Sequence, residues 1–221
     1  MIENVLHPRI IENKDWATAL FIFSFVLIAV AKSLFENRFV EFSRLIVSDK
    51  YIKVYKDSSQ MMSLFTVFLF VVQLISFSFF IHLLLYNFGY ILKTDWLTYI
   101  QIVTFLTVYI LSKYLIEKII ATAFDIEEFG EQFNLQKVSY RTYIGVFLLP
   151  INCFLFYYDT ISHEIILGFA AIVLLINLFT YLISLKNYQN ILMGKLFYFI
   201  LYLCALEIAP YYFMYYWFTK N

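Results

Sequence analysis

Residues 63–86 of the chain read SLFTVFLFVVQLISFSFFIHLLLY and contain no Asp, Glu, Lys or Arg. About 20 predominantly apolar residues in an α-helix are enough to cross the ~30 Å hydrocarbon core of a lipid bilayer. A continuous apolar run of this length is more than a soluble protein uses for one core helix. The stretch therefore predicts a transmembrane helix.

The rest of the chain has the same character. Of its 221 residues, 62% are hydrophobic and only 14% are charged, and the mean hydropathy is +0.77. Soluble domains carry about 25% charged residues, so a water-soluble fold could not bury this much apolar surface. An aromatic share of 22% suits helices whose rings face lipid tails and headgroups. We expect an all-α, polytopic membrane bundle that forms a single transmembrane domain over residues 1–221, with the lipid bilayer as its surroundings.

Six apolar segments are long enough to cross the bilayer, and their boundaries are good to a few residues. The predicted spans are about 16–34, 63–86, 96–116, 142–158, 165–185 and 192–217. The first is short, being apolar only from Trp16 to Ala31, and the fourth is interrupted by Pro150. Five spans is the alternative interpretation.

The first segment ends in Ala29-Val30-Ala31, which resembles a signal-peptidase site after a short apolar run. A signal peptide has a positively charged leader, whereas the leader here mixes acidic and basic residues. Six basic residues also follow the segment, in the loop that comes next. We therefore expect an uncleaved span.

The distribution of basic residues predicts the orientation. With six spans, four of the 16 Lys and Arg residues fall on the side of the termini, and the other twelve fall on the opposite side. The four are Arg9, Lys14, Lys93 and Lys220. The positive-inside rule places the basic side in the cytoplasm, so both termini are predicted to be periplasmic. Trp16, Trp96 and Trp217 all fall on the outer side in this arrangement, as interfacial tryptophans should.

The first cytoplasmic loop carries an aromatic stripe. Phe35, Phe39, Phe42 and Ile46 recur at spacings of four, three and four, which places them on one face of a helix over about 34–47. An amphipathic helix lying in the membrane interface is one interpretation. The other is a docking face for a partner protein.

Two ionisable residues lie inside predicted spans, where charge is costly and functional roles are common. Glu207 is in the last span and His82 is toward the outer end of the second, so both reach the outer half of the bilayer and could meet. Glu207 could couple to protons or contact a substrate, or it could be a carboxyl hydrogen-bonded for structural reasons. His82 alone fits a satisfied interfacial histidine better than a metal or haem ligand.

Three side-chain amides are predicted at mid-depth, namely Gln73, Asn152 and Asn177, each on a different span. Such amides commonly hydrogen-bond between helices. They could also line a polar transport pathway, and Pro150 just before Asn152 could mark a broken helix of the kind found in transporters.

Other chemistry has little support in the sequence. No serine motif, Gly-rich phosphate loop, zinc signature or catalytic carboxylate pair is present, so no catalytic residue, metal site or cofactor is predicted and the protein is not expected to be an enzyme. The net charge is zero and the basic residues are dispersed, which argues against nucleic acid as a partner. The two cysteines, Cys153 and Cys204, lie in apolar stretches and show no pairing or metal spacing.

The last span contains the string LYLCALEIAP, from Leu201 to Pro210. In this string, and more weakly in Phe133-Asn134, in Leu148-Leu149-Pro150 and in Ser48-Asp49-Lys50-Tyr51, the chain resembles the Bacteroidota membrane family called domain of unknown function 4271. The resemblance covers most of the chain and implies the inner membrane of a Gram-negative bacterium. The family has no known activity, so the resemblance transfers no catalytic residue and only points again to Glu207.

Two functions from different classes remain. The amphipathic stripe and the basic first loop offer contact surface, so the first expectation is a non-enzymatic subunit or assembly factor of a larger complex of inner-membrane proteins. The alternative is a small transporter built around Glu207, His82 and the mid-depth amides.

Overall fold

The computed structural model describes residues 14–45, 50–55, 63–123, 127–158 and 162–187, together with Tyr216. These residues form seven α-helices and contain no strand, which confirms the all-α prediction for this part of the chain. The helices are α1 (Asp15–Leu34), α2 (Glu36–Ser43), α3 (Lys50–Val54), α4 (Leu64–Asn87), α5 (Trp96–Ala123), α6 (Glu127–Tyr157) and α7 (His163–Asn187).

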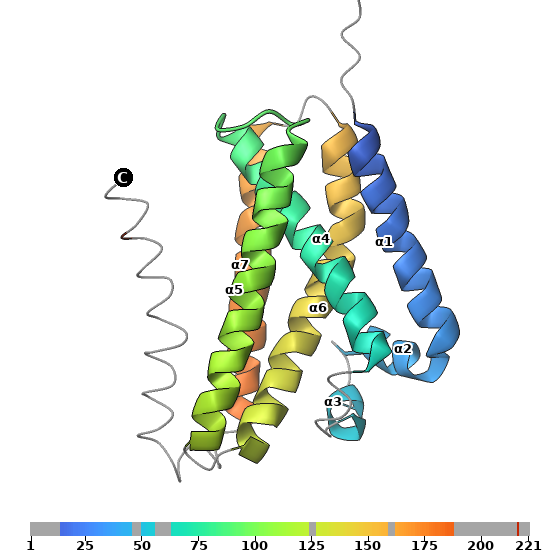
Figure 1. The fold of residues 1–221 in the computed structure, drawn as a ribbon, viewed down its shortest axis with the longest axis vertical. Coiled ribbons are helices and arrows are strands. Elements are labelled where there is room, and N and C mark those ends of the chain that lie inside the picture. Colours follow the sequence, from blue (N-terminus) through green and yellow to red (C-terminus); the bar gives the residue numbers. More distant parts are fainter. Residues whose placement is uncertain are drawn as a thin grey trace, which may run out of the picture.

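Five of these helices contain a stretch long and apolar enough to cross a membrane. They are α1, α4 and α5 over their whole lengths, Gly130–Tyr157 of α6 and His163–Thr180 of α7. Figure 1 shows them running up and down the long axis of the molecule, with α2 and α3 together at one end. We call this the α2–α3 end, and the end that carries the loop 88–95 between α4 and α5 the opposite end.

Two helices are longer than the predicted spans. α5 continues to Ala123 where the span was expected to end near 116, and α6 begins at Glu127 where the span was expected to begin near 142. Hydropathy falls in these extensions, but Lys137 of α6 forms an ion pair with Glu117 of α5 at 3.0 Å, so the two helices stay packed there. α6 also continues through Pro150 without ending. The predicted sixth span, 192–217, lies outside the described residues except for Tyr216, which is helical.

α4 is the central helix. About half of its apolar stretch is buried, compared with 11% for α5 and 6% for α7. It packs against α1, α5 and α6, and Figure 1 shows it crossing obliquely among them. The main core joins Phe21 of α1, Phe79 of α4, and Leu149 and Phe156 of α6. This core lies toward the opposite end of the bundle.

A second core holds α2 and α3 against the beginning of α4 and the middle of α6. It contains Phe42, Tyr51, Phe65 and Tyr143, all nearly inaccessible to solvent. α2 is shorter than the helix expected over about 34–47. Phe35 adopts φ −131° and ψ 50° and so separates α2 from α1, and α2 itself ends at Ser43. Residues 46–49, with Ile46, lie outside the described residues.

Candidate functional site

A series of polar side chains runs along α4 where it faces α6. Thr66, Gln73 and Ser76 lie on α4, and at ~1.5 Å per residue they cover about 15 Å of helix, roughly half of a bilayer core. Gln73 and Ser76 are completely buried. Thr142 and Asn152 contribute to the series from α6. We call these five residues the α4–α6 polar line.

The Gln73 amide lies at the point where α4 and α6 come closest. Thr142 Oγ1 donates a hydrogen bond to Gln73 Oε1 at 2.7 Å. The other amide atom, Gln73 Nε2, is buried and has no hydrogen-bond partner among the described residues. Leaving a polar group unpaired in an apolar interior costs about 1–3 kcal/mol in proteins.

Asn152 makes the second link between the two helices. Its Nδ2 donates to the Ser76 carbonyl oxygen at 2.7 Å and to Ser76 Oγ at 3.3 Å. Its Oδ1 is buried and again has no partner within the described part of the chain. Both amides of the polar line therefore satisfy one polar atom across the helix interface and leave the other one unsatisfied.

His82 lies nearer the opposite end, on the face of α4 that packs against α1 and α5. Its Nε2 lies 3.1 Å from the carbonyl oxygen of Lys93, which can only accept, so Nε2 carries a proton. The ring packs edge-on against Trp16 and Tyr99. His82 is completely buried, and this hydrogen bond holds the loop 88–95 against α4.

The remaining predicted site residues lie apart from the line. Asn177 of α7 donates to Val173 O of its own helix at 2.8 Å, so of the three predicted amides only Gln73 and Asn152 form a hydrogen bond between helices within the described residues. Glu207 lies outside the described residues, and its pairing with His82 stays a prediction.

Arg38 of α2 is a buried charge that sequence reasoning did not single out. Only 6% of the residue is exposed, and the guanidinium lies 4.6 Å from the ring centroid of Tyr55 and 4.9 Å from that of Phe65. It donates to Ser63 Oγ at 2.7 Å and to Thr66 Oγ1 at 3.2 Å. The sequence did contain a signal: Arg38 is three residues after Phe35 and four before Phe42, a spacing that places it on the same helix face as these two aromatic residues.

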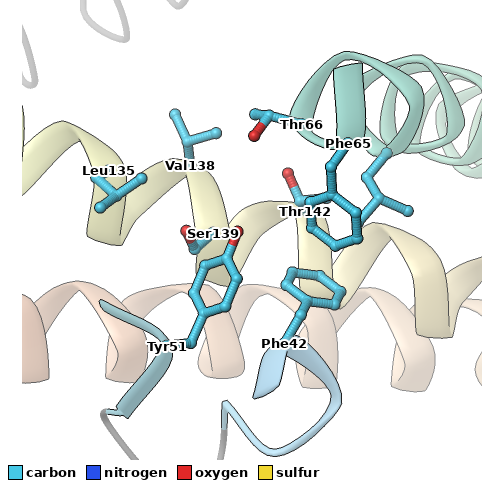
Figure 2. Close-up of a pocket in the computed structure, with 9 residues that line it drawn as sticks. Phe42, Tyr51, Phe65, Thr66, Leu135, Val138, Ser139 and Thr142 are labelled. Carbon is cyan, nitrogen blue, oxygen red and sulfur yellow. The ribbon is translucent and has the colours of Figure 1, made fainter. Parts of the chain in front are cut away.

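Arg38 connects the polar line to the α2–α3 end. Burial raises the pKa of the neighbouring Tyr51 hydroxyl, and the nearby Arg38 charge opposes that rise. Figure 2 shows Tyr51 and Phe42 reaching toward Ser139 and Thr142 of α6. A cavity of about 10 Å³ lies among these residues, enough for roughly one water molecule. Hydrogen-bonding groups therefore continue from the Arg38 guanidinium to Thr142 and Gln73.

The aromatic stripe of the first loop is largely covered by the chain itself. Phe42 is buried against Tyr51, Phe65 and Tyr143, with ring centroids 5.6–5.9 Å apart. Phe35 and Phe39 are half-buried. The Phe35 ring packs on the Phe65 ring, and the ring centroids of Phe39 and Phe42 lie 6.5 Å apart. The described part of the stripe is thus a packing face of the bundle.

Among the described residues, no group of three or more His, Cys, Asp or Glu side chains has a geometry that could hold a metal ion.

The family model described as Domain of unknown function (DUF4271) matches residues 17–218, which is nearly the whole chain. No curated protein and no solved structure matches.

Proposed function

The chain belongs to the family described as Domain of unknown function (DUF4271), and we propose that it is a multi-pass membrane transporter that passes a small polar solute along the α4–α6 polar line. The observation that supports this function is the pair of buried amides, Gln73 and Asn152, each with one polar atom unpaired among the described residues.

Each buried, unpaired amide atom destabilises the folded protein, and this energetic cost is the reason to assign the two amides a functional role. The helices around them are apolar, and the hydrogen bond that each amide makes, with Thr142 or with Ser76, leaves its other polar atom unpaired in that apolar interior. The packing of α4 against α6 uses only the amide atom that is hydrogen-bonded across the interface. A solute that crosses the membrane needs hydrogen-bonding atoms that the resting protein has not already paired. Polar groups retained at such a cost commonly mark substrate and ion pathways in membrane proteins.

The test is side-chain accessibility, which needs no knowledge of the solute. Both native cysteines, Cys153 and Cys204, are replaced by Ala, and single cysteines are placed at Gln73, Ser76 and Asn152. A small membrane-impermeant methanethiosulfonate reagent is then applied to right-side-out and to inverted vesicles. If α4 and α6 separate during transport, water reaches the line, and the three positions react from at least one side.

Asn177→Cys is the matched control, because Asn177 is also an amide in an apolar helix but is bonded within α7. It should stay unreactive. Failure of all three line positions to react from either side, in protein that still inserts and accumulates, would rule out the pathway.

The topology belongs to the same proposal. We place six spans in the inner membrane of a Gram-negative bacterium of the Bacteroidota, with both termini periplasmic. The described helices support this orientation, since the α2–α3 end carries many basic residues and the opposite end carries Lys14 and Lys93. Those at the α2–α3 end include Lys32, Arg38, Arg44, Lys50, Lys118, Lys137 and Arg141. Alkaline phosphatase fusions should be active after Asn221 and inactive after Lys50, and the reverse pattern would overturn the orientation.

A second candidate is the subunit or assembly factor of a larger membrane complex. Its support is α5, whose Phe105, Val108 and Leu111 remain well exposed along the middle of an apolar helix. Lipid would cover this face equally well. A photo-crosslinking amino acid at position 108, activated in intact cells, distinguishes the two. A discrete crosslinked protein supports a complex, and crosslinks to lipid alone contradict it.

A further inference from the structure

The outer face of α5 carries a regular row of exposed side chains. Six exposed positions recur along the helix at alternating spacings of four and three residues. This is the heptad pattern with which one helix packs along another. The six residues are Leu97, Gln101, Thr104, Val108, Leu111 and Leu115, and we call them the α5 seam.

The seam lies on the side of α5 that does not pack on the bundle. Tyr99 of α5 is buried against Phe79 of α4, and Glu117 is buried beside Lys137 of α6. Each of these two α5 residues follows a seam residue by two positions, so at 3.6 residues per turn it lies on roughly the opposite side of the helix. Figure 1 shows α5 on the side of the bundle away from α1. The seam is therefore open to a further helix.

Two of the seam residues are polar and lie at membrane depth. Gln101 is ~7.5 Å and Thr104 is ~12 Å along the helix from Trp96, the tryptophan at the start of α5. Both side chains are exposed. Lipid tails would cover the apolar members of the seam, but they offer no donor or acceptor to an amide or a hydroxyl. A protein surface with polar groups at the same depth fits the seam better than lipid alone.

We propose that a second copy of this chain covers the seam, so that the protein is a symmetric dimer joined through α5. Two copies of one chain insert in the same orientation, so a two-fold axis along the membrane normal makes their α5 helices parallel. Each seam residue then faces its own counterpart at the same depth. This dimer does not rest on the proposed transport function, because the seam faces away from α4 and α6.

Gln101 makes the seam complementary to itself. An amide is both donor and acceptor, so Nε2 of each Gln101 can donate to Oε1 of the other. The Thr104 hydroxyl can pair with its counterpart in the same way. A polar residue at one position of an apolar seam fixes the register of the helices and their number. A partner of different sequence would need matching groups at this depth, whereas a second copy has them by symmetry.

The length of the seam matches the membrane. From Leu97 to Leu115 it runs ~27 Å, close to the ~30 Å of a hydrocarbon core. The next heptad position is Lys118, which is also exposed. Two copies in contact there would place like charges opposite each other, so the helices should separate beyond Leu115.

Disulfide cross-linking in native membranes tests the dimer. Cys153 and Cys204 are first replaced by Ala, and single cysteines are placed at Val108, Leu111 or Leu115. Oxidation with copper phenanthroline should give a product at twice the 26.4 kDa mass of the chain for each seam position. The protein without cysteine should give none.

Ile116→Cys is the matched control for Leu115→Cys. The two neighbouring residues are 45% and 57% exposed, but Ile116 lies ~100° around the helix from Leu115. It should cross-link at most about one fifth as much, because it points away from the two-fold axis. Equal cross-linking at the two positions would indicate random collision and overturn the proposal. So would a product of any other mass, or no product from any seam position.

Substitution of Gln101 tests the hydrogen-bonded contact. Gln101→Leu should raise the dissociation constant of the dimer roughly 5- to 30-fold, and Gln101→Asn should keep it within about threefold because the amide remains. Energy transfer between donor- and acceptor-labelled copies, measured in liposomes of increasing lipid content, gives the constant. Thermal unfolding should be nearly the same in both variants, since Gln101 is exposed on its own chain. An unchanged dissociation constant in Gln101→Leu would refute the amide contact.

The outcome is separable from that of the transport experiment. Seam cross-linking without cysteine accessibility along the α4–α6 polar line would keep the dimer and remove the transport function. Accessibility along the line without seam cross-linking would keep the pathway and refute the dimer.

Discussion

Gly145 of α6 lies directly against Gln73 of α4. A Cβ atom built on Gly145 would come within 3.0 Å of both Cα and Cγ of Gln73. Gln73 Cα belongs to the backbone and cannot turn away as a flexible side chain could. Small residues allow helices to approach closely in membranes, and here the close approach brings the Gln73 amide within reach of Thr142.

Gly145→Ala should therefore destabilise the protein by about 1–3 kcal/mol, the usual cost of overpacking. Gly168→Ala is the matched control, because Gly168 is also helical and a Cβ there meets nothing within 4 Å. That change should stabilise slightly, by roughly 0.5–1 kcal/mol, through the helix preference for Ala. Thermal unfolding in detergent measures both. Equal effects of the two substitutions would show that the crossing of α4 and α6 tolerates a methyl group.

Arg38→Lys should destabilise the packing of α2 and α3 on the bundle by about 1–2 kcal/mol. Lysine cannot reproduce the planar fork that contacts Ser63 and Thr66 while lying over Tyr55 and Phe65. Arg44→Lys is the control, since Arg44 is exposed just after α2. The two variants are compared by thermal unfolding. If Arg38→Lys unfolds at the same temperature as Arg44→Lys, the geometry of the guanidinium does not contribute to stability.

The ion pair between Glu117 and Lys137 should contribute more than the one between Glu41 and Lys50. The side chains of the first pair are 5% and 18% exposed, against 22% and 62% for the second. We expect a coupling free energy of about 1–3 kcal/mol for the buried pair from a double-mutant cycle with Glu117→Gln and Lys137→Gln. The same cycle on Glu41 and Lys50 should give about 0–1 kcal/mol. Similar couplings would mean that burial does not strengthen the pair.

Asp95 should make stability depend on acid pH. Its carboxylate accepts from Thr98 Oγ1 at 2.5 Å and from Thr98 N at 3.3 Å, capping the first turn of α5, and these bonds hold the pKa of Asp95 below its ordinary 3.8. A lowered pKa stabilises the folded state at pH above 3.8, and this contribution is lost as the pH falls through the folded-state pKa. Asp95→Ala should therefore lower the unfolding temperature at neutral pH, by the equivalent of about 1 kcal/mol.

Asn caps helices as well as Asp does, so Asp95→Asn should keep most of the cap, and its stability should change less with pH. The unfolding temperatures of the three proteins are compared from pH 2 to pH 7. A gap between the unaltered protein and Asp95→Ala that does not narrow below pH 3.8 would contradict the assignment.

The sequence by itself determined the fold class and most of the helix positions. Residues 63–86 are uncharged and apolar over the thickness of a bilayer, and the helix found there is Leu64–Asn87. Hydropathy reports only which residues avoid water, so it missed the ends of α5 and α6 that are polar yet helical. It predicted a similar membrane depth for Gln73, Asn152 and Asn177, but depth carries no information about which helices are neighbours.

Only the tertiary structure decided which polar groups meet. It placed α6 beside α4, so Asn152 bonds to Ser76 whereas Asn177 turns back on its own helix. It also placed Arg38 among Tyr55, Phe65 and Ser63, residues up to 27 positions away that no local periodicity connects. The physical reason is that helical period fixes the face on which a side chain lies. The partner of that face is chosen by the packing of whole helices, through close contacts such as that of Gly145 with Gln73.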